Sequence, residues 1–236
     1  MRSAHADAKA SLGSRRRAAG EDPAKRNQIL DGAKRCFLSV GFANASMNQI
    51  TAEAGVSKGT IYVYFADKEG LFKALIEREK SAVLSGAQDA LDQGGSVTDV
   101  LLRFGTYVST RMTAEEVVRA QRMVLGVIEQ MPEIARTFYG GDTFSAHRVL
   151  AHYFDTKVAS GDLVIADTDL AARQFLDLSM ASNFKRRLFG NLLEPMSATE
   201  INHIVTSAVG MFLAYYGPQH ANRAPPPRGS SETVSS

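Results

Sequence analysis

The residues of this chain whose types and spacing could do chemistry stand close together between Ser57 and Phe65. These positions include a lysine, a glycine, a threonine and two tyrosines. They offer a positive charge, several hydroxyl groups and a place where a backbone can be approached closely. Such a set suits a surface that enters a nucleic-acid groove and binds phosphates and base edges. A catalytic surface would need other groups, so the chemistry predicted here is binding.

An enzymatic interpretation would have to use a few scattered side chains. They are three histidines and their possible companions: His147, His152, His203, Asp155, Glu129 and Ser145. His147 and His152 are five positions apart, about 140° around a helix, so they cannot chelate one metal from one face as i, i+4 histidines do. The sequence also lacks a glycine-rich phosphate loop on a strand and a nucleophile elbow. It predicts no enzyme, no catalytic residue and no metal site.

Two short helices must position the binding groups. Ser46 and Gln49 form a capping box, which predicts a helix that begins near Met47. Ile50 and Ala54 lie on one face of that helix. Gly55 can adopt the positive φ angle that ends a helix in a sharp turn.

The second helix follows at once. Ser57 is its N-cap, and Ile61 and Phe65 share the inward face at i, i+4 spacing. Four residues are predicted to point outward, with Tyr62 at the boundary: Gly59, Thr60, Val63 and Tyr64. The pattern is that of a helix-turn-helix. A structural three-helix module that never touches DNA is the alternative.

The segment SMNQITAEAGVSKGTIYVYFADKEGLF resembles the DNA-binding segment of tetracycline-repressor (TetR) family regulators, and the GVSKGTIYxYF core matches nearly throughout. The resemblance implies three helices, the third in the major groove, and a fourth that leads to a helical effector-binding and dimerisation domain. It assigns phosphate binding to Ser46, Tyr62, Tyr64 and Lys68. It places Asn48, Lys58, Gly59, Thr60 and Val63 toward bases.

This sequence departs from the family pattern at two positions. Ala45 stands where Thr or Ser is frequent, and Thr51 stands where a small Ala usually packs against the neighbouring helix. We expect the Thr51 hydroxyl to bond back to the preceding turn. Both departures leave the fold prediction unchanged.

Charge is distributed unevenly along the 236 residues, although the net charge is only +2. Up to Lys80 there are 14 Lys and Arg against 9 Asp and Glu, whereas the remainder has 13 against 16. The basic end therefore coincides with the motif, which favours a DNA partner there. Residues 1–21 form a predicted disordered basic arm, in which Arg15, Arg16 and Arg17 either contact DNA or are simply solvated.

Composition indicates a cytoplasmic protein. No apolar run approaches the roughly 20 residues that cross a bilayer, and the N-terminus lacks a hydrophobic signal core. Cys36 is the only cysteine, on an apparently buried helical face, so we expect a reduced and inert thiol.

We predict an all-α protein with four segments: the arm 1–21, a helix-turn-helix DNA-binding domain 22–66, a helical effector-binding and dimerisation domain 67–217, and a disordered tail 218–236. The first helix starts at Asp22-Pro23 and runs to Gly41, and Asp67 caps a helix that reaches about Leu91. Further helix starts are predicted near Ser96, Thr113, Pro132, Asp142, Asp167 and Ser197. Of these, Thr113 with Glu116 and Ser197 with Glu200 are interpreted as capping boxes.

The region beyond Gly95 is rich in apolar and aromatic residues. Most of them must form core, but four would supply an adaptable apolar pocket with a few hydroxyls: Tyr107, Met123, Tyr139 and Phe175. Such a pocket suits a small hydrophobic effector, and no cofactor is expected. This region also looks, more loosely, like the effector domain of AefR-like members of the family.

The last two predicted helices, 168–189 and 198–216, carry a broad apolar face. It consists of Ile201, Ile204, Val205, Ala208, Val209 and Phe212. In the TetR family such a pair packs against its symmetry mate, which implies a homodimer. The alternative is an ordinary core helix.

Together these features predict a homodimeric transcriptional regulator, most simply a repressor that a ligand releases from a palindromic operator. An activator or ligand-independent regulator of the same fold is the first alternative. A dimeric interaction protein that does not bind DNA is the second.

Overall fold

The computed structural model describes residues 22–133 and 146–218, and every regular element within these ranges is a helix. The all-α prediction is confirmed. The N-terminal elements are α1 (Pro23–Asn44), α2 (Met47–Ala54), α3 (Lys58–Tyr64) and α4 (Lys68–Asp92). The others are α5 (Val97–Thr113), α6 (Glu115–Val127), α8 (Ala146–Ala159), α9 (Thr168–Met180), α10 (Asn183–Leu188) and α11 (Ala198–Tyr216).

Local sequence signals explain where the first four helices begin. Asp22 accepts a hydrogen bond from the Ala24 amide, and Pro23 follows it in the first turn of α1. Asp67 caps α4 through the Gly70 amide at 2.7 Å. Gly41, the expected end of the first helix, has non-helical angles (φ 80°, ψ 162°), so α1 consists of two helical stretches that meet in a kink at this residue.

Two hydrophobic cores hold the helices together, and α4 belongs to both. The first core joins α1, α2 and α3 to the N-terminal half of α4 and the end of α6. Three rings mark its centre, with Phe37, Phe42 and Phe72 in contact at centroid distances of 4.7 to 5.6 Å. Cys36 is buried in this core, and burial raises the pKa of its thiol, which agrees with an unreactive cysteine.

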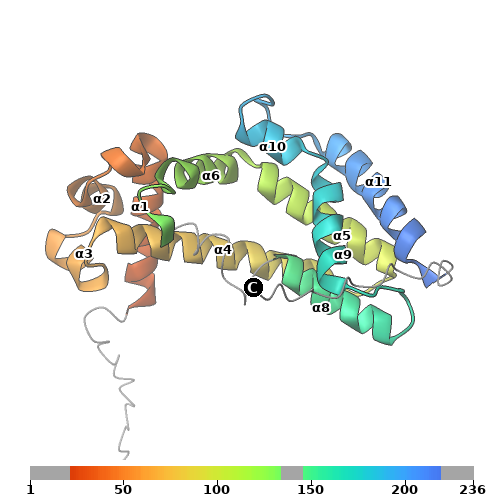
Figure 1. The fold of residues 1–236 in the computed structure, drawn as a ribbon. Coiled ribbons are helices and arrows are strands. Elements are labelled where there is room, and N and C mark those ends of the chain that lie inside the picture. The colour runs from red at the N-terminus through yellow and green to blue at the C-terminus, as the bar shows by residue number, and fades with distance from the viewer. Residues whose placement is uncertain (1–21, 134–145, 219–236) are drawn as a thin grey trace, which may run out of the picture.

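The second core lies among the C-terminal half of α4 and helices α5, α8, α9 and α11. Figure 1 shows α4 running from the three N-terminal helices along the length of the molecule to this second group. Its 25 residues correspond to about 37 Å at the usual helical rise. A displacement of α4 would therefore be felt in both cores.

Two sequence-based expectations in the second half are wrong. Thr113 is the last residue of α5 and is buried, and its hydroxyl bonds back to the Ser109 carbonyl, so it does not form a capping box with Glu116. Ala114 takes the cap position of α6 without a side-chain bond. The capping boxes at Ser96 and Ser197, in contrast, are present.

The predicted helix 168–189 is also two helices. Ala181 (φ 44°) and Ser182 (φ 65°) adopt left-handed conformations and separate α9 from α10. The sequence does not reveal this break, because neither Ala181 nor Ser182 is a glycine or a proline and the neighbouring residues are compatible with a helix.

Several expectations fall on residues outside the described ranges. They are the arm 1–21 with Arg15 to Arg17, the helix start at Asp142, the pocket candidate Tyr139, and most of the C-terminal tail. Among the residues that are described, none of the helices has the length and apolar character to cross a membrane.

Candidate nucleic-acid interface

The turn between α2 and α3 has the geometry that its residues predict. Gly55 adopts φ 62°, and the amide of Val56 donates to the Thr51 carbonyl at 3.2 Å. Gln28 from α1 donates to the Ala54 carbonyl at 2.8 Å and so holds the turn from below. The orientation of α3 is fixed by these bonds and by packing on the first core.

Close packing of α1 on α2 depends on one glycine. A Cβ atom added at Gly32 would lie 2.5 Å from Ala54, which leaves no room for a larger residue. Thr51 bonds back to the Met47 carbonyl at 2.6 Å, as expected. The Thr51 hydroxyl, which stands where the family usually has an alanine, thus has its hydrogen-bond partner within α2.

Ser46 acts as the predicted helix cap. Its hydroxyl accepts from the Gln49 amide at 3.3 Å, while Gln49 Oε1 accepts from the Ser46 amide and hydroxyl, both at 2.9 Å. This arrangement places the N-terminal amides of α2 at the protein surface next to the exposed Asn48.

The outer surface of α3 carries most of the predicted DNA-binding groups. Lys58 and Gly59 are exposed, and Tyr62 and Val63 expose 46% and 50% of their area. Thr60 is half-buried, and its hydroxyl lies 2.7 Å from the Ser57 hydroxyl, which fixes its direction. Together with Asn48 of α2, these residues form what we call the α3 surface.

The two tyrosines exchange the positions expected from the sequence. Tyr62, expected at the boundary, is exposed, whereas Tyr64, expected outside, is half-buried against the first core. Tyr64 follows Ile61 by three positions and therefore shares its inward side. Tyr62 is consequently the more accessible hydroxyl for a phosphate.

Lys68 has a structural role that the sequence interpretation missed. Its ammonium donates to the carbonyls of Phe42 at 2.9 Å and Ala45 at 3.0 Å, with a longer contact of 3.4 Å to Ala43. It also lies 4.5 Å from the centre of the Phe42 ring. The end of α1 is thus a negative partner of Lys68 within the chain, and its contact with a DNA phosphate stays a prediction.

Behind these helices, a cavity of about 330 Å³ lies between the two cores. Its wall comes from α1, α4, the end of α5, α6, the start of α8 and the second half of α9, and it is mostly apolar. The apolar lining includes Phe72, Leu75, Val83, Met112, Met123 and Leu176. The size lies near the lower end of the range of roughly 300–1,000 Å³ for small-molecule sites.

Of the four pocket residues predicted from the sequence, Met123 lines this cavity. Phe175 does not: it is fully buried in the second core against Phe104 and Phe212. Tyr107 packs on Gly86 and donates to the Val83 carbonyl at 3.0 Å, and it borders a separate shallow depression. Apolar composition alone could not separate cavity wall from core.

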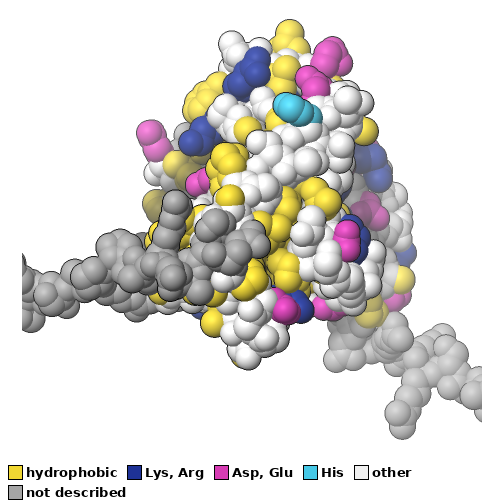
Figure 2. Space-filling view, turned by 90° about the vertical axis from the view of Figure 1, so that its right-hand side faces the viewer, with side chains coloured by type: hydrophobic (Ala, Val, Ile, Leu, Met, Phe, Trp, Pro, Cys, Tyr) yellow, Lys and Arg dark blue, Asp and Glu magenta, His cyan; other side chains and the backbone are white. Residues whose placement is uncertain are grey.

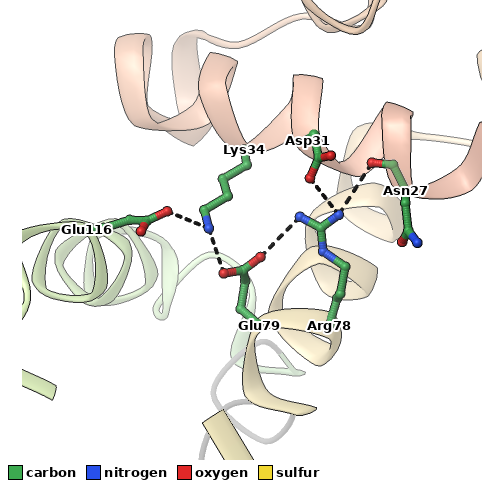
Figure 3. Close-up of polar contacts among 6 residues, drawn as sticks. All are labelled: Asn27, Asp31, Lys34, Arg78, Glu79 and Glu116. Carbon is green, nitrogen blue, oxygen red and sulfur yellow. Dashed lines mark hydrogen bonds and ion pairs between the residues drawn. The ribbon is translucent and has the colours of Figure 1, made fainter. Parts of the chain in front are cut away.

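Charged residues at the cavity wall tie α1 to α4 and α6, as Figure 3 shows. Lys34 of α1 contacts Glu79 of α4 at 2.7 Å and Glu116 of α6 at 2.5 Å. Arg78 contacts Asp31 at 2.8 Å and Glu79 at 3.1 Å. We call these five residues the α1 ion-pair cluster.

The cluster shifts the ionisation of its members. Burial works against the charge of Lys34, but its bonds to Glu116 and Glu79 outweigh burial and raise the pKa of its ammonium. The bond to Lys34 lowers the pKa of Glu116. Both pKa shifts favour the state in which Lys34 and Glu116 are charged.

The sequence analysis missed this cluster, although one signal was available. Leu30, Lys34 and Leu38 follow one another at i, i+4 spacing, so the lysine interrupts an apolar row. A cation at such a position needs a partner on a neighbouring helix. The partner Glu116 was assigned instead to a capping box that does not form.

The start of α6 is also held from the other side. Arg187 of α10 is buried, and it contacts the Glu115 carboxylate at 2.6 Å and the Thr113 carbonyl at 3.1 Å. Arg122 of α6 donates to the carbonyls of Arg187 and Leu188 at 2.6 and 2.9 Å. Adjacent glutamates thus link α6 to α1 through Glu116 and to α10 through Glu115.

The predicted dimer face of α11 needs correction. Five of its six residues pack inside their own chain and are buried: Ile201, Val205, Ala208, Val209 and Phe212. Helical periodicity cannot distinguish burial within a chain from burial against a partner. Ile204 instead begins an outer row at helical spacing with Met211 and Tyr215, which expose 51% and 48% of their area.

Further apolar side chains are exposed in this half of the chain. Val164 and Leu170 expose 41% and 49% of their area, and the Val164 amide bonds the Tyr216 carbonyl at 2.9 Å. The face shown in Figure 2 has hydrophobic side chains across much of its middle. We call Ile204, Met211 and Tyr215 the outer α11 row.

Within residues 22–133 and 146–218, no group of three or more His, Cys, Asp or Glu side chains is arranged to hold a metal ion. His147 lies 3.2 Å from Asp169.

Comparison with known families gives two matches along the chain. Residues 29–75 match the model of bacterial regulatory proteins of the TetR family. Residues 99–218, half of the chain, match the C-terminal domain of AefR-like transcriptional repressors.

Individual relatives agree with these matches. The transcriptional repressor Rv1474c of Mycobacterium tuberculosis is 43% identical over 56 residues, which cover 24% of this chain and 30% of the relative. The chain thus matches less than a third of that protein's length. A TetR-family regulator of Mesorhizobium loti has the same fold, with a TM-score of 0.76 and 24% identity over 82% of this chain and 97% of its own. The flavonoid-responsive regulator FrrA has a TM-score of 0.69 and 27% identity over 84% of this chain and all of its own.

Proposed function

Because this chain belongs to the TetR family of transcriptional regulators, we propose that it represses transcription as a homodimer on a palindromic operator and is released by a small ligand. Members of this family are regulators and not enzymes. In the proposal, residues 22–66 bind DNA, and residues 67–217 bind the effector and the partner copy.

The α3 surface is the observation that carries the proposed DNA contact. Lys58 was expected to face bases, but it is the exposed first residue of α3 and is proposed here to bind a phosphate, as is Tyr62. Asn48, Gly59, Thr60 and Val63 offer hydrogen bonds and apolar contacts to base edges. The Ser46 cap would present the first amides of α2 to a phosphate.

The outer α11 row supports the proposed homodimer. A two-fold axis beside α11 would pair the row with itself and cover the exposed Met211 and Tyr215. Such a dimer would carry two α3 helices. An operator of matching symmetry would place its half-sites about 34–36 Å apart, or a multiple of that distance.

The cavity between the cores supports the proposed release. Its wall includes α4, which shares both cores, and α6, which is bonded to α1. A ligand that fits a different arrangement of these helices would change the spacing of the two α3 surfaces. It would then lower DNA affinity through its differential affinity for the two arrangements. A small, largely apolar effector fits the lining.

Selection of binding sites from randomised duplex DNA tests the proposal. The purified chain is expected to enrich a two-fold symmetric sequence. Gly32→Val, which would disturb the packing of α1 on α2, serves as a variant that loses the selected site. Absence of any enriched sequence with the wild-type chain would refute specific DNA binding.

A further inference from the structure

The cavity wall carries a charge pattern that restricts which ligand it can hold. Three cations line it, Lys34, Lys80 and Arg111, against two anions, Glu79 and Glu116. The rest of the wall is mostly apolar. Both carboxylates are in contact with Lys34 and neither contacts Arg111, so the guanidinium of Arg111 would attract an anionic ligand and repel an amine.

Arg111 is the cation best placed to receive a ligand. It lies half-buried in the last turn of α5 and lines the cavity. Its guanidinium makes no hydrogen bond to any residue of the described ranges, and it acts on Glu116 only through its charge. A guanidinium beside an apolar cavity binds best to a planar acceptor such as a carboxylate.

The two carboxylates that hold Lys34 are not equally fixed. Glu79 is also bonded to Arg78 and is the less exposed of the two, with 35% of its side chain accessible. Glu116 has 49% of its side chain accessible and is bonded to Lys34 alone among the described residues. An incoming anion would therefore displace Glu116 more readily than Glu79.

From these observations we propose that the effector is an amphipathic organic monoanion, whose apolar body fills the cavity and whose carboxylate replaces Glu116 between Lys34 and Arg111. This inference rests on the proposed function and names the ligand class of the same cavity. Binding at this position would also affect the helices that carry the α3 surface. Loss of the Lys34–Glu116 contact would weaken the link between the start of α6 and α1, where Arg119 still donates to the Leu38 carbonyl at 2.6 Å, while Glu115 keeps α6 bonded to α10.

A charge series on one apolar body tests the ligand class directly. Decanoate, decanol and decylamine share a chain and differ in the charge of the head group at pH 7.5. Binding of each to the full chain is measured by isothermal titration calorimetry without DNA. We expect decanoate to bind about tenfold or more tightly than decanol, with decylamine weakest.

Two substitutions assign the preference to named residues. Arg111→Met is expected to remove the advantage of decanoate over decanol, and Arg111→Lys to keep part of it. Lys185→Met is the matched control, because Lys185 is exposed on α10 and outside the cavity wall. Glu116→Gln should bind decanoate more tightly, because the competing carboxylate is gone. Thermal unfolding of each variant verifies that it is folded.

Equal affinity for the three compounds, a preference for decylamine, or no binding of any of them would overturn the ligand class. A full preference for decanoate that survives in folded Arg111→Met would overturn the assigned residue. The calorimetry involves no DNA, so these results are independent of operator binding. Failure of the wild-type chain to select DNA would refute the proposed function instead.

Discussion

At the scale of single residues, Lys68 illustrates how position in a motif and role in the fold can differ. It lies at the start of α4, where the helix dipole disfavours a cation, and the family resemblance implies a DNA phosphate as its negative partner. Within the chain, its ammonium bonds the carbonyl end of α1. The ammonium therefore connects α4 to α1 and helps to orient the unit that carries the α3 surface.

Replacement of Lys68 by Met should therefore destabilise the protein rather than only weaken DNA binding. Loss of bonds between a charged group and carbonyls predicts a decrease of about 1.5–3 kcal/mol in the free energy of unfolding. Urea unfolding measures this value, with Lys73→Met on the exposed side of α4 as control. If Lys68→Met had the same free energy of unfolding as the wild type, the bonds between Lys68 and the end of α1 would contribute nothing to stability.

The residue scale also shows what the sequence could predict. The caps at Asp22, Ser46, Ser57 and Asp67 and the turn at Gly55 were predictable, because each depends on residues within a few positions. The partner of Lys68 was not, because it lies more than 20 residues away along the chain.

At the scale of elements, α6 connects the three N-terminal helices with the rest of the molecule. Its end packs in the first core, and its start is bonded to α1 and α10. Figure 1 places α6 beside α1. These links come from long-range pairs such as Lys34 with Glu116, which periodicity does not reveal. Helix existence was therefore predictable, whereas the cavity wall and the break at Ala181 were not.

The link between α1 and α6 should respond to pH in a defined direction. The pKa of Glu116 is lowered by Lys34, so its contribution to stability is complete above the ordinary value of 4.5 and is lost as pH falls through the lowered value. The pKa of Lys34 is raised, so its contribution is complete below 10.5 and is lost as pH rises through the raised value. The pair is therefore effective between these limits.

Melting temperatures of the wild-type chain and Glu116→Gln, measured from pH 3 to 8, test this expectation. The variant should melt lower near pH 7, and the difference should vanish toward pH 3. Because Glu116 is half exposed, solvent screening limits the effect to roughly 1 kcal/mol or less. A difference that persists at pH 3 would mean that the substitution acts through packing and not through charge.

At the scale of the whole molecule, the arrangement of two cores that share α4 gives a physical basis for coupling. A ligand between the cores would contact elements of both and would thereby change their relative position. The buried face of α11 illustrates the limit of sequence analysis at this scale. An apolar row predicts a contact but not which chain provides the other side.

The proposed dimer predicts a clear effect of a charge in the outer α11 row. Tyr215→Glu would place carboxylates near the two-fold axis and should convert the dimer to a monomer in sedimentation experiments. Thr206→Glu, exposed on another side of α11, is the control and should leave the dimer intact. A dimer that tolerates Tyr215→Glu would exclude this row as the interface.

The most direct test of the central claim, specific DNA binding through the α3 surface, is a salt titration. The affinity of the wild-type chain and of Lys58→Met for the selected duplex and for a scrambled duplex is measured at several salt concentrations. We predict that the wild type prefers the selected duplex by about 10³-fold or more. The variant should bind both duplexes more weakly, with a salt slope smaller by about 1 for each Lys58 in the complex. Equal wild-type affinity for the two duplexes, or identical slopes for the two proteins, would contradict the account.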